Sequence, residues 1–226
     1  MPAASRVFVY GASGHGKVVA DILLARNIAV EGFIDDDPRR QSAELLGLRV
    51  LGDCKWLAEQ AQNCSVSAAL AIGDNFARCK LAHQCIAMKV DLITAVHPSA
   101  TIAASAILGH GVVVAAGCQV NPDAYIGDGT ILNTGSVVEH DCRVGNFTHL
   151  SPIAAMGGGA RLGDFSWLGM GSVVIHGVTV GSGCIVGAGA VVVKDVRDWV
   201  VAVGVPAHVI KEVEPIIRFG LDFIGE

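Results

Sequence analysis

Aliphatic residues recur at every sixth position through the second half of the chain. The series contains only Ile, Leu, Val and Met, and it runs unbroken through sixteen positions: Ile102, Leu108, Val114, Val120, Ile126, Leu132, Val138, Val144, Leu150, Met156, Leu162, Leu168, Val174, Val180, Val186 and Val192. The residue two places before each of them is always Ala, Val, Cys, Thr or Ser. A period of six fits neither an α-helix nor the alternation of an ordinary strand. It is the hexapeptide signature of a parallel β-helix, and we expect both columns to point into its core.

The first part of the chain has a different pattern, in which short apolar runs alternate with helix-like segments. Strands are predicted within RVFVYG (residues 6–11), VEGFIDDD (30–37) and SVSAALAIGDN (65–75), and helices within residues 11–27 and 76–90. Strands that alternate with helices favour a parallel sheet. We therefore expect a Rossmann-like α/β domain over residues 1–95, a β-helix over residues 96–210 and a C-terminal tail over residues 211–226.

The six-residue pattern resembles the left-handed β-helix of the hexapeptide acyltransferase superfamily, in which three hexads form one triangular coil of eighteen residues. On that lattice Glu139, His140, Asp141 and His149 fall between the inward columns, at corners or on outer faces. An accessible imidazole at position 140 titrates near neutral pH, and Asp141 can orient a histidine ring, although the sequence leaves open which one. Gly158 lies one coil beyond His140. An open slot with free backbone N–H groups beside a base is what acyl transfer requires.

Three alternatives for this polar cluster are a nucleophilic cysteine, a metal site and ordinary surface histidines. Cys142 belongs to the small inward column, so we expect it to pack in the core rather than to act as a nucleophile. His140 and His176 are two coils apart and too distant to share an ion, and no third ligand is evident, so no metal is expected. Surface histidines without a function remain an alternative for both His140 and His149.

A glycine-rich turn, Gly11 to Gly16, follows the first predicted strand and opens the first helix. Its glycines allow a phosphate to approach the backbone, and a helix N-terminus favours an anion. Asp35 and Gly73 follow the other two strands, so all three segments meet at the carboxyl edge of the predicted sheet, where ligands bind. The spacing G-x-x-G-x-G differs from the dinucleotide fingerprint, so we expect a nucleotide or nucleotide sugar. The alternative is a tight strand–helix turn beside a solvated acidic loop.

Composition narrows the class of protein. The chain has 226 residues, 52% of them hydrophobic, and a formal net charge of −5 without a basic patch, which argues against nucleic acid as a partner. No apolar run approaches the roughly 18 residues of a membrane-spanning helix, and the N-terminus does not read as a signal peptide. Seven cysteines without a CxxC pair fit unpaired thiols, so a cytoplasmic location is expected.

Several motifs together resemble the nucleotide-sugar acetyltransferases of the sialic acid O-acetyltransferase type, a group that includes N-acetyltransferases of UDP- and GDP-linked amino sugars. These motifs are VYGASGHGKVVADIL, FIDDD, AIGDN, HPSATIA, ILNTGSVVEHDCRVGNFTHLSP and VGVPAHVIK, in order over about residues 5–211. The resemblance implies a homotrimer that binds acetyl-CoA along the β-helix at a subunit boundary. It also implies that the N-terminal domain holds the nucleotide sugar, linked to UDP or GDP.

The same resemblance implies roles for individual residues. His140 is similar to the general base and Asp141 to its acidic partner, which is often Glu in the family. The acetyl-CoA contacts implied are His149, Gly158, Met170 and Ala188. The nucleotide-sugar contacts implied are Ser13, Gly14, His15, Asp35, Asp36 and Gly73.

The expected reaction is direct acetyl transfer from acetyl-CoA to the 4-amino group of a nucleotide-linked 4-amino-4,6-dideoxy sugar, without an acetyl-enzyme. One alternative is O-acetylation of a sialic acid or another sugar. A second is a non-catalytic β-helix scaffold that binds a nucleotide sugar. Glu139 and the C-terminal tail receive no role from the sequence.

Overall fold

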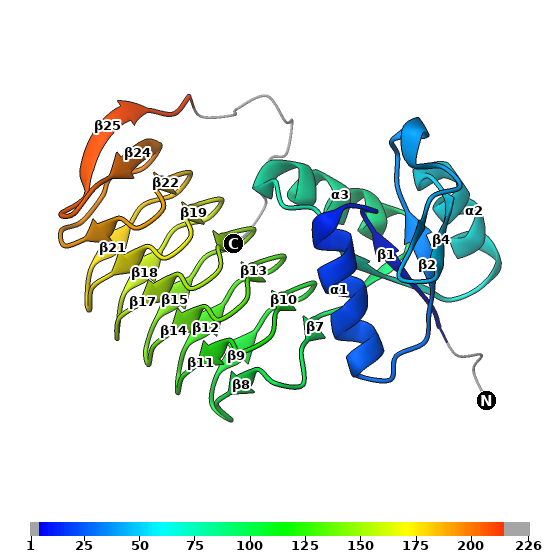
Figure 1. Ribbon diagram of the computed structural model, residues 1–226, viewed down its shortest axis with the longest axis horizontal. Helices are drawn as coiled ribbons and strands as arrows, with labels where there is room; N and C mark the ends of the chain where they lie inside the picture. Colours follow the sequence, from blue (N-terminus) through cyan, green and yellow to red (C-terminus); the bar gives the residue numbers. More distant parts are fainter. Residues whose placement is uncertain (1–4, 215–226) are drawn as a thin grey trace.

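The computed structural model describes residues 5–214, which form a small α/β unit followed by a long β-helix (Figure 1). The α/β unit is built on a six-stranded sheet in the order β3-β4-β2-β1-β5-β6, parallel except for the antiparallel pair of β3 and β4. Its strands are β1 (Arg6–Tyr10), β2 (Val30–Ile34), β3 (Glu44–Leu45), β4 (Leu48–Gly52), β5 (Val66–Leu70) and β6 (Asp91–Leu92). Its helices are α1 (Gly14–Ala25), α2 (Cys54–Asn63) and α3 (Asn75–Ala87), with a short 3-10 helix at Pro38–Arg40.

Local sequence explains where these elements begin. Valine and aromatic residues suit the central strand β1, since such side chains pack well on a pleated surface. The carboxylate of Asp53 accepts a hydrogen bond from the Trp56 N–H at the start of α2, and the carboxylate of Asp74 does the same for Ala77 at the start of α3. Each of these N-caps satisfies a backbone donor that the helix itself leaves unpaired.

The turn between β1 and α1 requires glycine. Gly11 has a φ of +116°, and a Cβ there would lie 2.6 Å from the carbonyl oxygen of Ala71, which continues β5. A Cβ at Gly16 would run into the carbonyl oxygen of Gly11. The glycines therefore let helix α1 start close against the carboxyl edge of the sheet.

The β-helix consists of two-residue strands that stack into three parallel sheets. The first sheet, β7-β10-β13-β16-β19-β22, contains Ala95–Val96, Val113–Val114, Ile131–Leu132, His149–Leu150, Trp167–Leu168 and Ile185–Val186. The second, β8-β11-β14-β17-β20-β23, contains Thr101–Ile102, Gln119–Val120, Val137–Val138, Ala155–Met156, Val173–Val174 and Val191–Val192. The third, β9-β12-β15-β18-β21, contains Ile107–Leu108, Tyr125–Ile126, Arg143–Val144, Arg161–Leu162 and Thr179–Val180.

Register and burial confirm the hexapeptide lattice. Val138 pairs with Val120 on one side and Met156 on the other, so each coil takes eighteen residues. Every member of the aliphatic column is buried except the first two, Ile102 and Leu108, which pack partly buried against the core. The left-handed β-helix predicted from the sequence is therefore confirmed.

The thiol of Cys142 faces the core, as its column predicts, and its side chain is fully buried. Burial raises the pKa of this thiol, so it stays protonated and unreactive.

An antiparallel pair closes the last coil. Strand β24 (Val200–Val203) adds to the first sheet beside β22, and β25 (His208–Glu212) returns against it. Such an atypical end covers the apolar core of a solenoid. The C-terminal tail expected over residues 211–226 lies outside the described residues from position 215 onward. None of the helices within residues 5–214 is long and apolar enough to cross a membrane.

Candidate active site

His140 and Asp141 form a hydrogen-bonded pair at the corner that follows β14. The Nδ1 atom of His140 lies 2.8 Å from Oδ2 of Asp141, and both side chains are about two-thirds exposed, at 63% and 65%. Asp141 has a φ of +61°, a left-handed conformation that Asp tolerates better than most residues. The structure thus answers a question that the sequence left open, because the imidazole that Asp141 contacts is that of His140.

Gly158 lies directly beside the other edge of this imidazole. A Cβ built at position 158 would come within 2.6 Å of both Nε2 and Cε1 of His140. The next residue, Gly159, donates its N–H to the His140 carbonyl at 2.8 Å, which fixes the two corners one above the other. Among residues 5–214, the N–H of Gly158 itself has no acceptor. The residue beside the open nitrogen of His140 therefore carries a backbone donor without an acceptor in the described chain.

Carboxylates around His140 tune its basicity. The hydrogen bond to Asp141 is the main cause that raises the pKa of His140 above its ordinary value, and the charges of Asp141 and Glu139 raise it further. Glu139 had no role in the sequence interpretation. In the structure it acts on the imidazole through its charge.

His149 lies in a different place from the His140 corner, on the outer face of the β-helix as the sequence predicts, but this face is covered rather than open to solvent. It belongs to β16, in the first sheet, and is only 7% exposed because the α/β unit covers it. Its ring stacks on Trp167 with centroids 5.3 Å apart, and the ring of His15 from α1 lies 6.4 Å away. Asn133 Nδ2 lies 3.2 Å from His149 Nε2.

Burial controls the protonation of this second histidine pair. It lowers the pKa of His149 to about 4, with smaller contributions from the charges of Arg78 and His15. The pKa of His15 also falls to about 4, through burial and then the charge of Arg78. Both rings are therefore neutral near pH 7. Within the described chain, Nδ1 of His149 and Nε2 of His15 are buried without a hydrogen-bond partner.

A cavity of about 300 Å³ opens at the carboxyl edge of the α/β sheet, where the sequence predicts the nucleotide sugar. Its lining comes from the ends of β1, β2 and β5 and from α3: Tyr10, Gly11, Asp35, Asp36, Ile72, Ala77, Lys80, Leu81 and Gln84. The structure therefore brings Asp35 and Asp36 to one cavity with the start of the glycine-rich turn. Ser13, Gly14 and His15 belong to the same turn, where α1 begins, and Gly73 follows Ile72.

The two carboxylates also organise the cavity wall. Asp35 accepts hydrogen bonds from the Ala12 N–H at 2.7 Å and from the Asp37 N–H at 2.9 Å. Asp36 accepts from the Tyr10 hydroxyl and from the Cys54 N–H, both at 2.8 Å. These bonds tie the glycine-rich turn to the end of β2.

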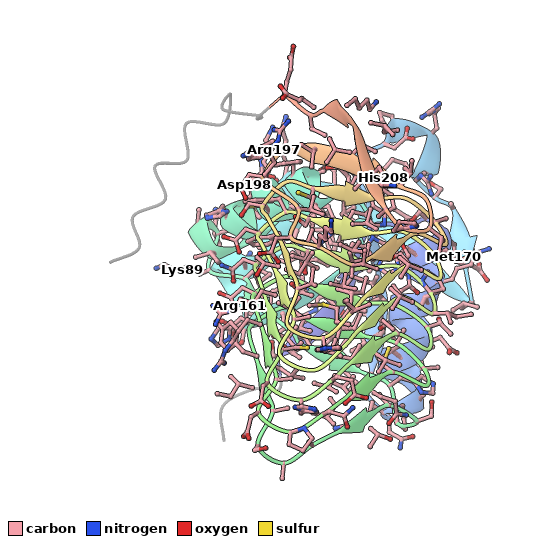
Figure 2. The ribbon with its side chains drawn as sticks, turned by 90° about the vertical axis from the view of Figure 1, so that its left-hand side faces the viewer. Lys89, Arg161, Met170, Arg197, Asp198 and His208 are labelled. Carbon is pink, nitrogen blue, oxygen red and sulfur yellow. The ribbon has the colours of Figure 1, made fainter. Side chains whose placement is uncertain are left out.

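Met170 and Ala188 occupy another corner of the β-helix than His140. They are one coil apart, and the carbonyl of Met170 accepts from the Gly189 N–H at 2.8 Å. Met170 is 59% exposed and projects from the edge of the β-helix opposite Arg161 (Figure 2). The second sheet separates this corner from the His140 corner, so within one chain the structure does not bring Met170 and Ala188 next to His140.

Two family models match the chain: the PglD N-terminal domain over residues 6–85 and the bacterial transferase hexapeptide over residues 159–194. The structure of PerB from Caulobacter crescentus, in complex with CoA and GDP-perosamine, is 43% identical to the chain. It aligns over 93% of this chain and 100% of that one, with a TM-score of 0.87. The acetyltransferase domain of PglB from Neisseria gonorrhoeae, in complex with acetyl coenzyme A, is 35% identical over 92% of this chain and 100% of that one, with a TM-score of 0.84.

The chain belongs to the nucleotide-sugar acetyltransferase family of hexapeptide β-helix proteins. A curated relative, UDP-N-acetylbacillosamine N-acetyltransferase of Bacillus subtilis, is 35% identical over 111 residues. That match spans 49% of this chain and about half, 51%, of the relative's length.

Sequence reasoning missed three residues that shape the surroundings of His149: Trp167, Asn133 and Arg78. Trp167 occupies an outward position of the repeat, and only its one-coil offset from His149 could have predicted the stacking. Asn133 lies sixteen residues before His149, and Arg78 is on α3. The contact of Asn133 depends on the geometry of a corner, and the contacts of Arg78 depend on how the α/β unit docks on the β-helix.

Within the described residues, no group of three or more His, Cys, Asp or Glu side chains is arranged to hold a metal ion.

Proposed function

We propose that the protein transfers the acetyl group of acetyl-CoA to the 4-amino group of a nucleotide-linked 4-amino-4,6-dideoxy sugar. The observation that carries the proposal is the His140 imidazole, with Nδ1 bonded to Asp141 and Nε2 open beside the unpaired N–H of Gly158. Base, orienting acid and oxyanion donor converge there, which is the arrangement that acyl transfer requires. The similarity to PerB, which covers 93% of this chain, supports the choice of an amino-sugar acceptor.

The proposed reaction is a direct transfer. The neutral sugar amine attacks the thioester carbon, a C–N bond forms, and the carbonyl electron pair moves to oxygen. The Gly158 N–H donates to that oxyanion, and His140 Nε2 removes the proton from the new ammonium. Collapse of the intermediate breaks the C–S bond, and His140 returns the proton to the departing sulfur. A carboxylate on Nδ1 keeps the proton on that nitrogen, so the lone pair of Nε2 faces the substrate.

Among the described residues, the His140 corner offers no side chain suited to form an acetyl-enzyme. Cys142, the nearest thiol in sequence, is fully buried, and burial raises its pKa. Its Sγ instead contacts the Gly157 carbonyl at 3.1 Å, inside the coil. This placement supports direct transfer.

We infer that the working unit is a homotrimer with acetyl-CoA along the boundary between copies. The outward positions of the last four strands of the second sheet form an apolar row that is half-buried in one chain: Val137, Ala155, Val173 and Val191. Such a row supports packing against another copy. The second sheet borders both the His140 corner and the Met170 corner. Packing through it would therefore bring His140 of one copy near Met170 and Ala188 of the next, which fits a thioester held between copies.

For the acceptor, the α/β cavity offers the nucleotide a glycine-rich turn at a helix N-terminus, a favourable place for phosphates. GDP is the favoured carrier, because the full-length similarity to PerB at 43% identity exceeds the half-length similarity to the UDP-linked relative at 35%. Ser13, Gly14, His15, Asp35, Asp36 and Gly73 are the residues we propose to contact the nucleotide sugar. His149 is proposed to contact the acetyl-CoA side of the site.

The test is thiol release from acetyl-CoA, followed with GDP- and UDP-linked 4-amino-4,6-dideoxy sugars and with sialic acid as acceptors. We expect release with the amino sugars, fastest with the GDP-linked one, and an amide in the product by mass spectrometry. Release only with a hydroxyl acceptor would favour O-acetylation. No release with any acceptor, despite nucleotide-sugar binding, would leave a binding scaffold and overturn the proposal.

A further inference from the structure

Arg78 is the largest fully buried side chain within the described residues, with no exposed surface at all. It lies on the first turn of α3, between the α/β sheet and the β-helix. Its guanidinium makes hydrogen bonds through Nε, Nη1 and Nη2, and none of the acceptors is a carboxylate. Burying a charged group is costly unless it is hydrogen-bonded, and here neutral acceptors together with the charge of nearby Asp74 compensate it.

The acceptors of Arg78 come from both structural units. In the α/β unit they are the carbonyls of Ile72 at 2.8 Å and Gly73 at 3.2 Å and the Asn75 side chain at 2.8 Å. In the β-helix they are the carbonyls of Gly129 at 2.6 Å and Thr148 at 2.9 Å. One guanidinium therefore links the loop after β5 to two neighbouring coils.

Asn75 extends this link by another coil. Its Nδ2 donates to the carbonyl of Phe165 at 2.9 Å and to that of Ser166 at 3.2 Å. We call Asn75 and Arg78 together the α3 clamp. Through it, one turn of α3 binds three successive coils at a single corner of the β-helix.

The α3 clamp connects the α/β cavity to the strand that carries His149. Ile72, whose carbonyl Arg78 binds, lines the α/β cavity, and Gly73 follows it. On the β-helix side, Thr148 directly precedes His149 in the chain. Helix α3 also contributes four residues to the cavity wall: Ala77, Lys80, Leu81 and Gln84. A shift of α3 against the coils would therefore move the cavity relative to His149.

We propose that Arg78 is a positioning residue, which holds the nucleotide-sugar cavity in register with the His149 strand so that the bound sugar reaches the β-helix. The inference rests on the proposed function. A planar guanidinium fork fixes the directions of several acceptors at once, which neither a lysine nor an apolar side chain does. Because reacting groups must be aligned closely, a misplacement of about 1 Å can cost about 100-fold in rate.

The experiment compares Arg78→Met and Arg78→Lys with a matched control, Phe76→Leu. Phe76 also reaches from α3 to the β-helix, where its ring stacks on Phe165 at 4.8 Å and on Trp199 at 6.2 Å. It makes no hydrogen bond to the Ile72–Gly73 loop or to Thr148, so the control loosens the same boundary without releasing the loop. Steady-state kinetics are measured for each substrate separately, below the melting temperature of every variant.

For Arg78→Met we expect kcat/KM for the nucleotide sugar to fall about 100-fold while the KM for acetyl-CoA stays within about twofold. The kcat/KM of Arg78→Lys for the nucleotide sugar should lie between the values of Arg78→Met and the wild type. Phe76→Leu should lower Tm but keep kcat/KM for both substrates.

Two outcomes would overturn the positioning role: kinetics of the Arg78 variants that match Phe76→Leu, or a KM for acetyl-CoA that rises as much as the KM for the nucleotide sugar. If Arg78→Met does not fold, Arg78→Lys decides by the same criterion. An inactive wild type would instead count against the proposed function, so the two failures are distinguishable.

Discussion

His140 and Asp141 are neighbours in the chain, yet their side chains meet across a corner, with Nδ1 of His140 2.8 Å from Oδ2 of Asp141. The left-handed backbone of Asp141, with a φ of +61°, turns the chain sharply at this point. The contact leaves Nε2 of His140 facing Gly158, one coil along the same corner. His140 is thus bonded at one nitrogen and open at the other. Substitutions of His140, Asp141 and Gly158 each change a different part of this arrangement.

Replacing His140 with Ala should lower turnover by about 10²–10⁴, the usual contribution of a general base. Because the side chain is exposed, we expect the Tm and the oligomeric state to stay unchanged. His176→Ala is the matched control, an exposed histidine two coils further along the same corner. Thiol release from acetyl-CoA measures both variants. Near-full activity of His140→Ala, or an equal loss in His176→Ala, would contradict the assignment of the base.

Asp141→Asn should change the pH dependence of the reaction. A general base works when it is deprotonated, so kcat/KM rises as pH passes through the pKa of His140. Asp141 raises that pKa above its ordinary value, and its removal should therefore shift the rise to lower pH while the plateau falls about tenfold or more. Profiles with the same amino sugar are compared, so that titration of the substrate amine cancels. An unshifted profile would mean that Asp141 does not act on the reacting histidine.

Gly158→Ala should abolish most activity at little cost in stability. The added Cβ would lie 2.6 Å from His140 Nε2, and the exposed imidazole can swing away instead of straining the backbone. We expect a loss of about 10² or more in kcat, since both the base and the oxyanion donor are disturbed. Gly177→Asn is a control on the same corner, where φ is +68° and no atom lies within 4 Å of a Cβ. Equal activities of the two variants would rule out crowding of His140.

The β-helix and the His140 corner follow from the sequence because both depend on contacts set by a fixed period. A repeat of eighteen residues places Gly158 over His140 without knowledge of any other part of the chain. The surroundings of His149 could not be predicted in this way. They depend on α1 docking on the first sheet and α3 on the corner that precedes it, and the Arg78–Thr148 contact joins residues 70 positions apart. Periodicity gives the direction of a side chain on the coil, but it does not show which other unit covers it.

Val173→Glu tests the boundary between copies. Val173 lies between Ala155 and Val191 in the apolar row on the second sheet, and burying an unpaired carboxylate there would be costly. If the proposed trimer forms through this row, we expect it to dissociate into monomers by light scattering, with activity lost because the proposed approach of Met170 and Ala188 of a neighbour to His140 is removed. Thr179→Glu, on the third sheet, is the matched control and should remain trimeric. A trimeric, active Val173→Glu variant would show that the copies pack elsewhere.

Acid should destabilise the fold through His15 and His149. Both have a pKa of about 4 in the folded chain, below the ordinary value of 6.5, so the unfolded chain binds more protons between these limits. Stability therefore rises with pH across this range and is lost as pH falls from about 6.5 towards 4, by on the order of 2 kcal/mol for each histidine. Denaturant unfolding at pH 7 and pH 5 measures the loss. In His149→Gln the difference between the two pH values should shrink, whereas His176→Gln, at an exposed position, should keep it. A wild-type stability that does not change between pH 7 and pH 5 would show that the two buried rings are not held neutral by the fold.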